Sequence, residues 1–222
     1  MARMHAALSE TNLYRQNSLS IASWPRLFQG RETIAASLAP NLDNLIAGDL
    51  ERLQDQWPVP EDLPQGIIHA DLFPDNAFFL GNDFSGVIDF YYACHECLLF
   101  DLAGICSDWA WRDGEFLTAH WQAFLAAYTR RRPLTEAEIA AWPAMLRAVA
   151  LRFWVSRLID ACFPMGGPDV QIHDPAPFKH LLLAYRDDPP GRAGRPQGRG
   201  AHRDLPAVRP ALRDARDRKT HH

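Results

Sequence analysis

Apolar residues recur three or four positions apart over most of the chain, a period that places them on one face of a helix. The clearest stripe runs from Asn41 to Trp57 and ends at Pro58, because proline disrupts a helix interior. The same period predicts further helices over residues 1–15, 101–111, 116–128, 135–162 and 174–185. The body of the protein is therefore expected to be mostly helical.

Local signals mark the boundaries of the later helices. Thr135 and Glu138 have the spacing of a capping box, in which each residue satisfies a backbone N–H of the other. Asp174 before Pro175 combines an N-cap with proline at the first helical position. Pro143 falls inside the longest segment and is expected to divide or kink it.

Short apolar runs predict strands between residues 66 and 90. Residues 66–68 form one such run, and residues 77–80 form another before the turn residues Gly81, Asn82 and Asp83. Residues 86–90 then return as the partner strand. Because two antiparallel strands of similar length cancel each other's displacement, Asp89 is expected close to Asn76.

The loop and hairpin carry the residue types of a phosphoryl-transfer site. The pattern His69-x-Asp71-x4-Asn76, followed by Asp89, supplies a carboxylate to orient a hydroxyl nucleophile and two oxygen ligands for Mg²⁺. His69 is expected to brace the loop backbone rather than to carry a proton. The alternative is a polar loop in which these residues occur together by chance.

Composition indicates one sizeable core and a cytoplasmic protein. Of the 222 residues, 47% are hydrophobic, yet no apolar run approaches the length of a membrane span. The first residues lack the apolar centre of a signal peptide, and four cysteines without regular spacing fit a reducing compartment. We therefore expect no membrane partner.

The C-terminal segment, residues 187–222, differs from the body in composition. It is rich in Arg, Gly and Pro and has no apolar period, so we expect it to be disordered. From Arg186 onward the chain carries ten basic and five acidic residues, although its net charge is −4. A basic tail could bind nucleic acid or an anionic membrane. We instead expect an incidental extension and no nucleic-acid partner.

The segments His69–Asn76 and Ile88–Phe90 resemble the aminoglycoside phosphotransferase and choline kinase superfamily. Residues 88–94, 100–103, 150–158 and 173–175 narrow the resemblance to the homoserine kinase branch, which acts in threonine synthesis. The resemblance covers about residues 1–186. It implies an α+β fold, namely a protein-kinase-like C-terminal lobe that is mostly helical with a small catalytic β-hairpin. Its parts are a catalytic loop (67–76), a metal-binding hairpin (77–90) and a helical subdomain (98–186).

The resemblance also implies a role for each matching residue. Asp71 corresponds to the catalytic base, and Asn76 and Asp89 correspond to the residues that bind Mg²⁺, with ATP as co-substrate. Asp101 resembles the family's buried aspartate, which braces the catalytic loop together with His69. The substrate would be a small molecule, homoserine or a related amino alcohol.

Homoserine carries an α-carboxylate, which suits a guanidinium group. Arg152 and Arg157 are the candidates, but residues five apart on one helix point in different directions, and either arginine could be a surface ion-pair residue. Glu96 or Asp75 could hold the α-ammonium group.

Kinases of this type also hold ATP with a glycine-rich loop and a lysine in an N-terminal lobe. This sequence has only Lys179 and Lys219, and its first glycine is Gly30. We therefore expect that the lobe is missing, through a start-site error, a split gene or a truncation, and that this chain alone has little or no activity. The face that would meet the lobe is expected to be exposed and prone to self-association.

Two further groups of residues contain side chains that could form a site. Residues 94–97 read Cys-His-Glu-Cys, but neither a four-ligand zinc site nor a thioredoxin context is complete. The aromatic residues Trp109, Trp111, Phe116 and Trp121 could form a cation site, although their spacing favours the core.

Three classes of function remain open. The first is a homoserine phosphotransferase, and the second is a related kinase acting on an aminoglycoside, choline or another amino alcohol. The third is a non-catalytic interaction domain. The presence of Asp71, Asn76 and Asp89 together favours an enzyme.

Overall fold

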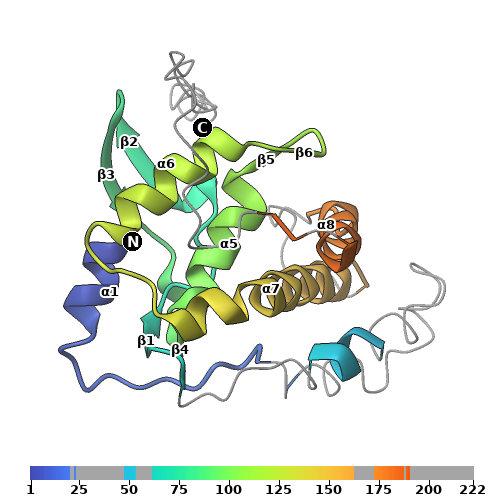
Figure 1. The fold of residues 1–222 in the computed structure, drawn as a ribbon, viewed down its shortest axis with the longest axis horizontal. Helices are drawn as coiled ribbons and strands as arrows, with labels where there is room; N and C mark the ends of the chain where they lie inside the picture. Colours follow the sequence, from blue (N-terminus) through green and yellow to red (C-terminus); the bar gives the residue numbers. More distant parts are fainter. Residues whose placement is uncertain (21–22, 24–47, 54–61, 163–172, 188, 191–222) are drawn as a thin grey trace, which may run out of the picture.

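The computed structural model describes residues 1–20, 23, 48–53, 62–162, 173–187 and 189–190. Within these ranges the fold is mixed α and β, with three helices packed together (Figure 1). These are α5 (Leu99–Trp109), α7 (Glu136–Cys162) and α8 (Ala176–Asp187). Helices α1 (Ala2–Leu8) and α6 (Thr118–Thr129) pack around them.

The predicted caps form at both later helices. Thr135 Oγ1 accepts a hydrogen bond from the Glu138 N–H at 3.2 Å, and Glu138 Oε2 accepts one from the Thr135 N–H at 2.9 Å. At α8, Asp174 Oδ1 accepts from the Ala176 N–H at 2.8 Å. Pro143 lies inside α7 and does not divide it, so that alternative was wrong.

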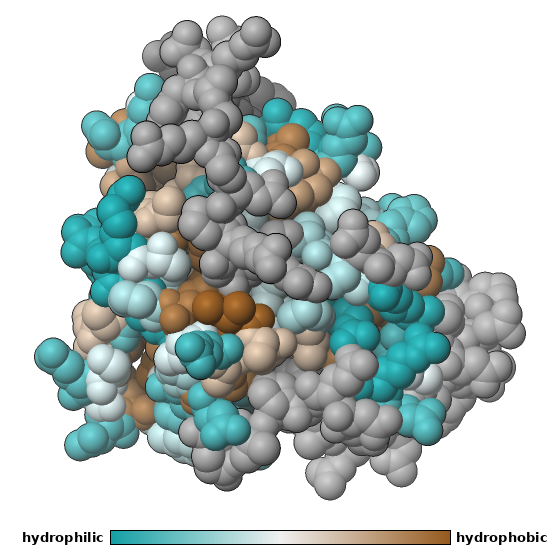
Figure 2. All heavy atoms as spheres, in the orientation of Figure 1, coloured by the Kyte–Doolittle hydropathy of each residue, from teal (hydrophilic) through white to brown (hydrophobic). Residues whose placement is uncertain are grey.

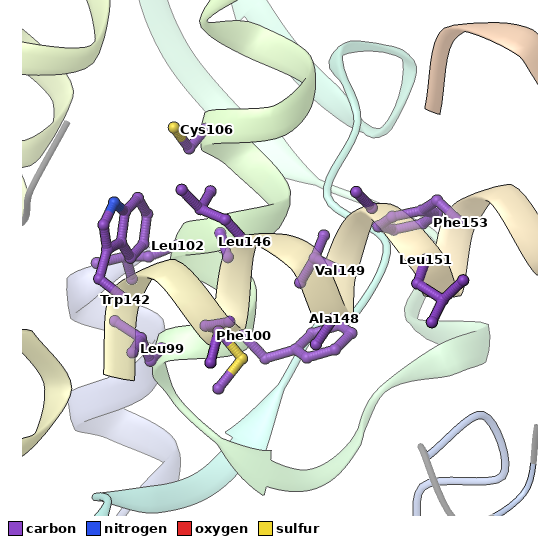
Figure 3. Packing of buried hydrophobic residues seen from close by; sticks show 14 of the residues in the cluster. Leu99, Phe100, Leu102, Cys106, Trp142, Leu146, Ala148, Val149, Leu151 and Phe153 are labelled. Carbon is purple, nitrogen blue, oxygen red and sulfur yellow. The ribbon is translucent and has the colours of Figure 1, made fainter. Parts of the chain in front are cut away.

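The core lies where α5 crosses α7. Figure 3 shows Leu99 and Leu102 of α5 beside Trp142 and Leu146 of α7, and all four are fully buried. Burying one such side chain stabilises a fold by roughly 1.5–3 kcal/mol. On the face drawn in Figure 2, hydrophilic and intermediate residues are mixed, and the most prominent strongly apolar surface is a short strip near the centre.

Three small antiparallel sheets are attached to the described helices. β1 (Gln65–Ile68) pairs with β4 (Cys94–Cys97), β2 (Ala77–Leu80) pairs with β3 (Asp83–Val87), and β5 (Trp111–Arg112) pairs with β6 (Glu115–Phe116). The short 3-10 helices η3 (Pro74–Asn76) and η4 (Phe90–Tyr92) flank the β2–β3 hairpin. The hairpin projects from the body at the upper left of Figure 1.

Two helix boundaries differ from the prediction for a local reason. Asp113 and Gly114 both have positive φ, at 52° and 80°, the combination that a tight two-residue hairpin turn requires. Because this turn forms β5–β6, α5 ends at Trp109 rather than at residue 111, and α6 begins at Thr118 rather than at residue 116.

Toward the two ends of the chain, the observed helices differ from their predicted ranges. The first helix covers Ala2–Leu8 rather than residues 1–15, and Leu13 is exposed. Of the predicted helix over 41–57, residues 48–53 are helical and the rest lie outside the described residues. Asp187 closes α8, and the Pro190 carbonyl accepts a hydrogen bond from Trp142 Nε1 at 3.0 Å. The predicted disordered tail otherwise lies outside the described residues, apart from Pro189. None of the described helices has the length and apolarity to cross a membrane.

Candidate active site

The loop after β1 is anchored by the buried carboxylate of Asp101, in the first turn of α5. Asp101 accepts hydrogen bonds from the backbone N–H groups of His69 at 2.9 Å and Ala70 at 2.8 Å. It also pairs with His5 Nε2 of α1 at 3.0 Å. Ala70 has φ +64°, a left-handed conformation that an alanine adopts only under local constraint. The Asp101 carboxylate, by holding both N–H groups, supplies such a constraint.

His69 connects the loop to the segment that follows β3. Its Nε2 donates to the Ile88 carbonyl at 2.9 Å, and its Nδ1 accepts from the Asp71 N–H at 3.3 Å. The ring also packs against Phe90, with centroids 4.7 Å apart. Both ring nitrogens of His69 are therefore engaged by backbone groups.

Asp71 lies two residues after His69 and is partly exposed. Its Oδ1 lies 3.5 Å from the guanidinium of Arg152, which α7 delivers from the core and which is itself buried. Burial raises the pKa of Asp71 from its usual value, while the Arg152 charge opposes that shift. Burial also lowers the pKa of Arg152. Arg152 is thus an internal residue in contact with Asp71 and not a surface ion-pair residue.

The two predicted metal ligands lie at neighbouring positions across the hairpin. Asn76 Nδ2 donates to the Asp71 carbonyl at 2.8 Å, and the Asn76 carbonyl accepts from the Ile88 N–H at 3.0 Å. Asp89, the next residue, is exposed and has φ +62°, which Asp tolerates better than most residues. Among the described residues, no group of three or more His, Cys, Asp or Glu side chains could hold a metal ion.

The second predicted arginine lies elsewhere on α7. Arg157 lies over the rings of Phe73 and Phe178, with its guanidinium carbon 5.4 and 4.5 Å from the two centroids. It donates one long hydrogen bond, 3.4 Å, to the Asp174 carbonyl. Burial lowers the pKa of Arg157, and the nearby charges of Asp108 and Asp71 oppose that shift.

Asp108 was missed by the sequence analysis. It lies in the last turn of α5, seven residues after Asp101, a spacing of two helical turns that places both on one side of the helix. Burial raises the pKa of Asp108 to about 6. A polar residue at this spacing from Asp101 was the available signal.

The candidates for an ammonium site are not equivalent. Glu96 lies on β4, where its carboxylate accepts hydrogen bonds from Asn17 Nδ2 at 3.0 Å and from the Cys97 N–H at 3.0 Å. Asp75 is exposed in η3.

Burial raises the pKa of the Cys94 thiol to about 12, and the pKa of Cys97 is also raised, so both thiols stay protonated near neutral pH.

The aromatic residues considered as a cation site do not form one cluster. Trp121 is buried and stacks on Trp142 with centroids 5.1 Å apart, while Trp111 packs on Phe116 at 5.4 Å. Trp109 instead donates from Nε1 to the Leu72 carbonyl at 2.9 Å. These contacts assign Trp121 to the core and Trp109 to the support of the loop.

Comparisons with known proteins match this chain to a phosphotransferase family and to homoserine kinases. The model of the phosphotransferase enzyme family (APH) matches residues 1–134. A homoserine kinase of Methylobacterium nodulans is 41% identical over 187 residues, which cover 84% of this chain and 58% of that protein. A homoserine kinase of Rhodopseudomonas palustris (strain TIE-1) is 43% identical over 184 residues, covering 82% of this chain and 56% of that protein.

The chain thus spans less than two thirds of the length of these curated relatives. The family match includes the whole of the loop anchored by Asp101, together with the β2–β3 hairpin and Asp89. This chain belongs to the phosphotransferase enzyme family.

Proposed function

We propose that this chain carries the catalytic loop of an ATP-dependent kinase that phosphorylates the side-chain hydroxyl of L-homoserine. The observation that carries the proposal is the arrangement around Asp71, a partly exposed carboxylate fixed by Arg152 on one side and tied through its carbonyl to Asn76 on the other. The homoserine kinases that are 41–43% identical support the choice of acceptor. The fold then corresponds to a kinase-like C-terminal lobe over residues 1–186.

In this proposal Asp71 accepts the proton of the acceptor hydroxyl as its oxygen attacks the γ-phosphorus of ATP. The bond from that phosphorus to the bridging oxygen breaks, and ADP leaves. Arg152 favours the ionised form of Asp71, which burial alone disfavours. Asp101 and His69 act indirectly, by holding the loop backbone that positions Asp71.

Asn76 and Asp89 fit a magnesium ion by their chemistry. The Asn76 amide donates through nitrogen to the Asp71 carbonyl, which leaves its oxygen available as a ligand, and Asp89 offers an exposed carboxylate one position past the backbone contact between residues 76 and 88. Two protein oxygens, with phosphate and water oxygens, match the preference of Mg²⁺. When bound, the ion would neutralise charge on the phosphates of ATP.

Exposed apolar side chains adjoin these residues. They include Phe78, Leu80, Phe84, Ile88, Phe90 and Tyr91, of which Leu80 is 76% and Tyr91 69% exposed. Exposed apolar side chains next to a reactive site support contact with a further protein lobe or self-association.

Turnover by residues 1–222 alone is expected to be slow. Kinases of this type bind the ATP phosphates with a lysine, and this sequence has only two lysines, Lys179 and Lys219. Lys179, on α8, is placed over the Trp154 ring, 5.9 Å from its centroid. The test must therefore detect weak transfer. Radiolabelled phosphate transfer from MgATP to homoserine, choline or kanamycin should be measured with wild type, Asp71→Asn and the matched control Asp83→Asn.

We expect homoserine to be the preferred acceptor. Asp71→Asn should reduce transfer by at least about 100-fold, the usual contribution of a positioned base. Asp83→Asn, an exposed change in the hairpin, should have no effect. Preferred transfer to choline or kanamycin would contradict the proposed acceptor, and undiminished transfer in Asp71→Asn would contradict the proposed base.

A further inference from the structure

A pocket of about 490 Å³ lies between the end of α5, the β5–β6 turn, α7 and α8. In Figure 1, α8 and the β5–β6 hairpin lie to the right of α5, with α7 below them. Apolar walls come from Trp111, Phe178 and Leu181, and polar groups come from Asp108 and Arg157. The site described above uses neither charge of this pocket.

The two charges enter the pocket from different helices and are not paired. Asp108 of α5 accepts no hydrogen bond from the described residues, and no ion pair within 4.0 Å joins it to Arg157 of α7 among the described salt bridges. Within the part of the chain that the structure describes, Arg157 makes one hydrogen bond, the long one to the Asp174 carbonyl. A partly buried carboxyl and a partly buried guanidinium therefore both retain hydrogen-bonding capacity toward the pocket.

Other charged groups nearby also shift the pKa of Asp108. Asp71 and Asp75 on the loop side further raise the pKa of Asp108, while Arg157 opposes the rise. Three more polar side chains line the pocket, from the β5–β6 hairpin and from α8: Arg112, Asp113 and His180.

Two contacts connect the pocket to the catalytic loop. Trp109, the neighbour of Asp108, donates to the carbonyl of Leu72, the residue after Asp71. Arg157 lies over the ring of Phe73, the next residue along the loop. The pocket charges and the proposed base are therefore held in one framework, and the charge of Asp71 is felt at both Asp108 and Arg157.

We propose that this pocket receives the acceptor, with Asp108 binding the α-ammonium group and Arg157 the α-carboxylate of an amino acid whose side-chain hydroxyl reaches Asp71. The inference rests on the proposed function and adds the residues that select its substrate. Arg157 is one of the two arginines predicted to bind this carboxylate. Asp108 takes the ammonium-binding role predicted for Glu96, because the Glu96 carboxylate already accepts two hydrogen bonds.

The chemistry of the pair favours a zwitterion over the other acceptors. Choline lacks a carboxylate for Arg157, and an aminoglycoside is a polycation that would meet the guanidinium unfavourably. A free amino acid satisfies both groups at once, and its binding leaves neither charge without a partner.

The test is direct binding by isothermal titration calorimetry with residues 1–222, which needs no turnover. The ligands are L-homoserine, N-acetyl-L-homoserine, which lacks the ammonium group, and L-homoserine amide, which lacks the carboxylate. The variants are Asp108→Asn and Arg157→Gln, with Asp83→Asn as the matched control.

We expect Asp108→Asn to weaken homoserine binding by at least about tenfold, as for the loss of a charged hydrogen bond. The same variant should leave the already weak binding of N-acetyl-homoserine unchanged. Arg157→Gln should show the corresponding pattern with homoserine amide. Asp83→Asn should bind as wild type does.

The possible results separate this inference from the proposed function. Unchanged homoserine binding in both variants would overturn the pocket assignment and leave the proposed acceptor intact. Binding of serine or threonine but not of homoserine, with dependence on both residues, would support the pocket and overturn the proposed acceptor. No binding of any hydroxyl amino acid at millimolar concentration would overturn the pocket assignment.

Discussion

The two ends of α5 carry an aspartate each, and the two carboxyl groups have opposite surroundings. Asp101, at the beginning of the helix, is buried and accepts from two backbone N–H groups and a histidine. Asp108, two turns later, lines a pocket and accepts from none of the described residues. A carboxyl group whose donors come from the chain supports the fold. A partly buried one without donors costs stability and is available to a ligand.

Both ends of α5 also hold the catalytic loop. Its first turn holds the backbone of the catalytic loop through Asp101, and its last turn holds the same loop through Trp109. The loop is thus fixed from both ends of a helix that is buried against α7. Asp108 is the acidic residue of the helix that this framework leaves open to the pocket.

Removing the satisfied carboxylate should have the largest effect. Asp101→Ala would leave the N–H groups of His69 and Ala70 and the Nε2 of His5 without their partner in the core, while His5 Nδ1 keeps its contact with the Tyr128 hydroxyl. We expect the free energy of unfolding to fall by roughly 3–5 kcal/mol. Urea unfolding followed by circular dichroism measures this loss. An unchanged midpoint would show that Asp101 does not hold the loop.

Removing the unsatisfied carboxyl should act in the opposite direction. The folded chain raises the pKa of Asp108 from 3.8 to about 6, so it binds this proton more tightly than the unfolded chain does. Stability is therefore lost as pH rises through that window, and the cost is fully present above it. Asp108→Asn should stabilise the unliganded chain at pH 7 by about 1–3 kcal/mol.

The same urea experiment at several pH values checks this expectation. The gain from Asp108→Asn should shrink as pH falls and disappear near pH 3, about one unit below the unfolded pKa, where the carboxyl is neutral in both states. A variant that is less stable than wild type at pH 7 would show that Asp108 has a structural partner and would break the contrast with Asp101.

The indole hydrogen bond at the end of α5 should have the smallest effect. Trp109→Phe removes the donor to the Leu72 carbonyl and keeps an aromatic ring against Phe79. We expect a loss of about 1 kcal/mol in the free energy of unfolding. Homoserine affinity measured in parallel should fall slightly. A loss as large as that from Asp101→Ala would show that the two ends of the helix contribute equally to the loop.

The features predicted correctly from the sequence depend on neighbouring residues. The capping box of Thr135 and Glu138 and the hairpin after Asn76 are local patterns, and both form, although the second strand of the hairpin covers Asp83–Val87 rather than residues 86–90. The turn at Asp113 and Gly114 is also local, but it was overlooked inside a helical pattern, and two helix boundaries shifted as a result.

Features that depend on distant residues were not predictable in the same way. The pairing of β1 with β4 joins segments separated by about 30 residues, and no short pattern specifies it. The availability of Asp108 depends on which donors the folded chain places around it. The helical period identified α5 as buried but could not show which of its carboxyl groups would find partners.

The most direct test of this contrast is the titration of the Asp108 carboxyl carbon by nuclear magnetic resonance, with and without homoserine, assigned with Asp108→Asn. We predict a midpoint near pH 6 in the free chain, in line with the raised pKa of Asp108. Homoserine should lower that midpoint, because a bound ammonium group favours the ionised form. A midpoint near the ordinary 3.8 in the free chain, or one that homoserine does not move, would contradict the account.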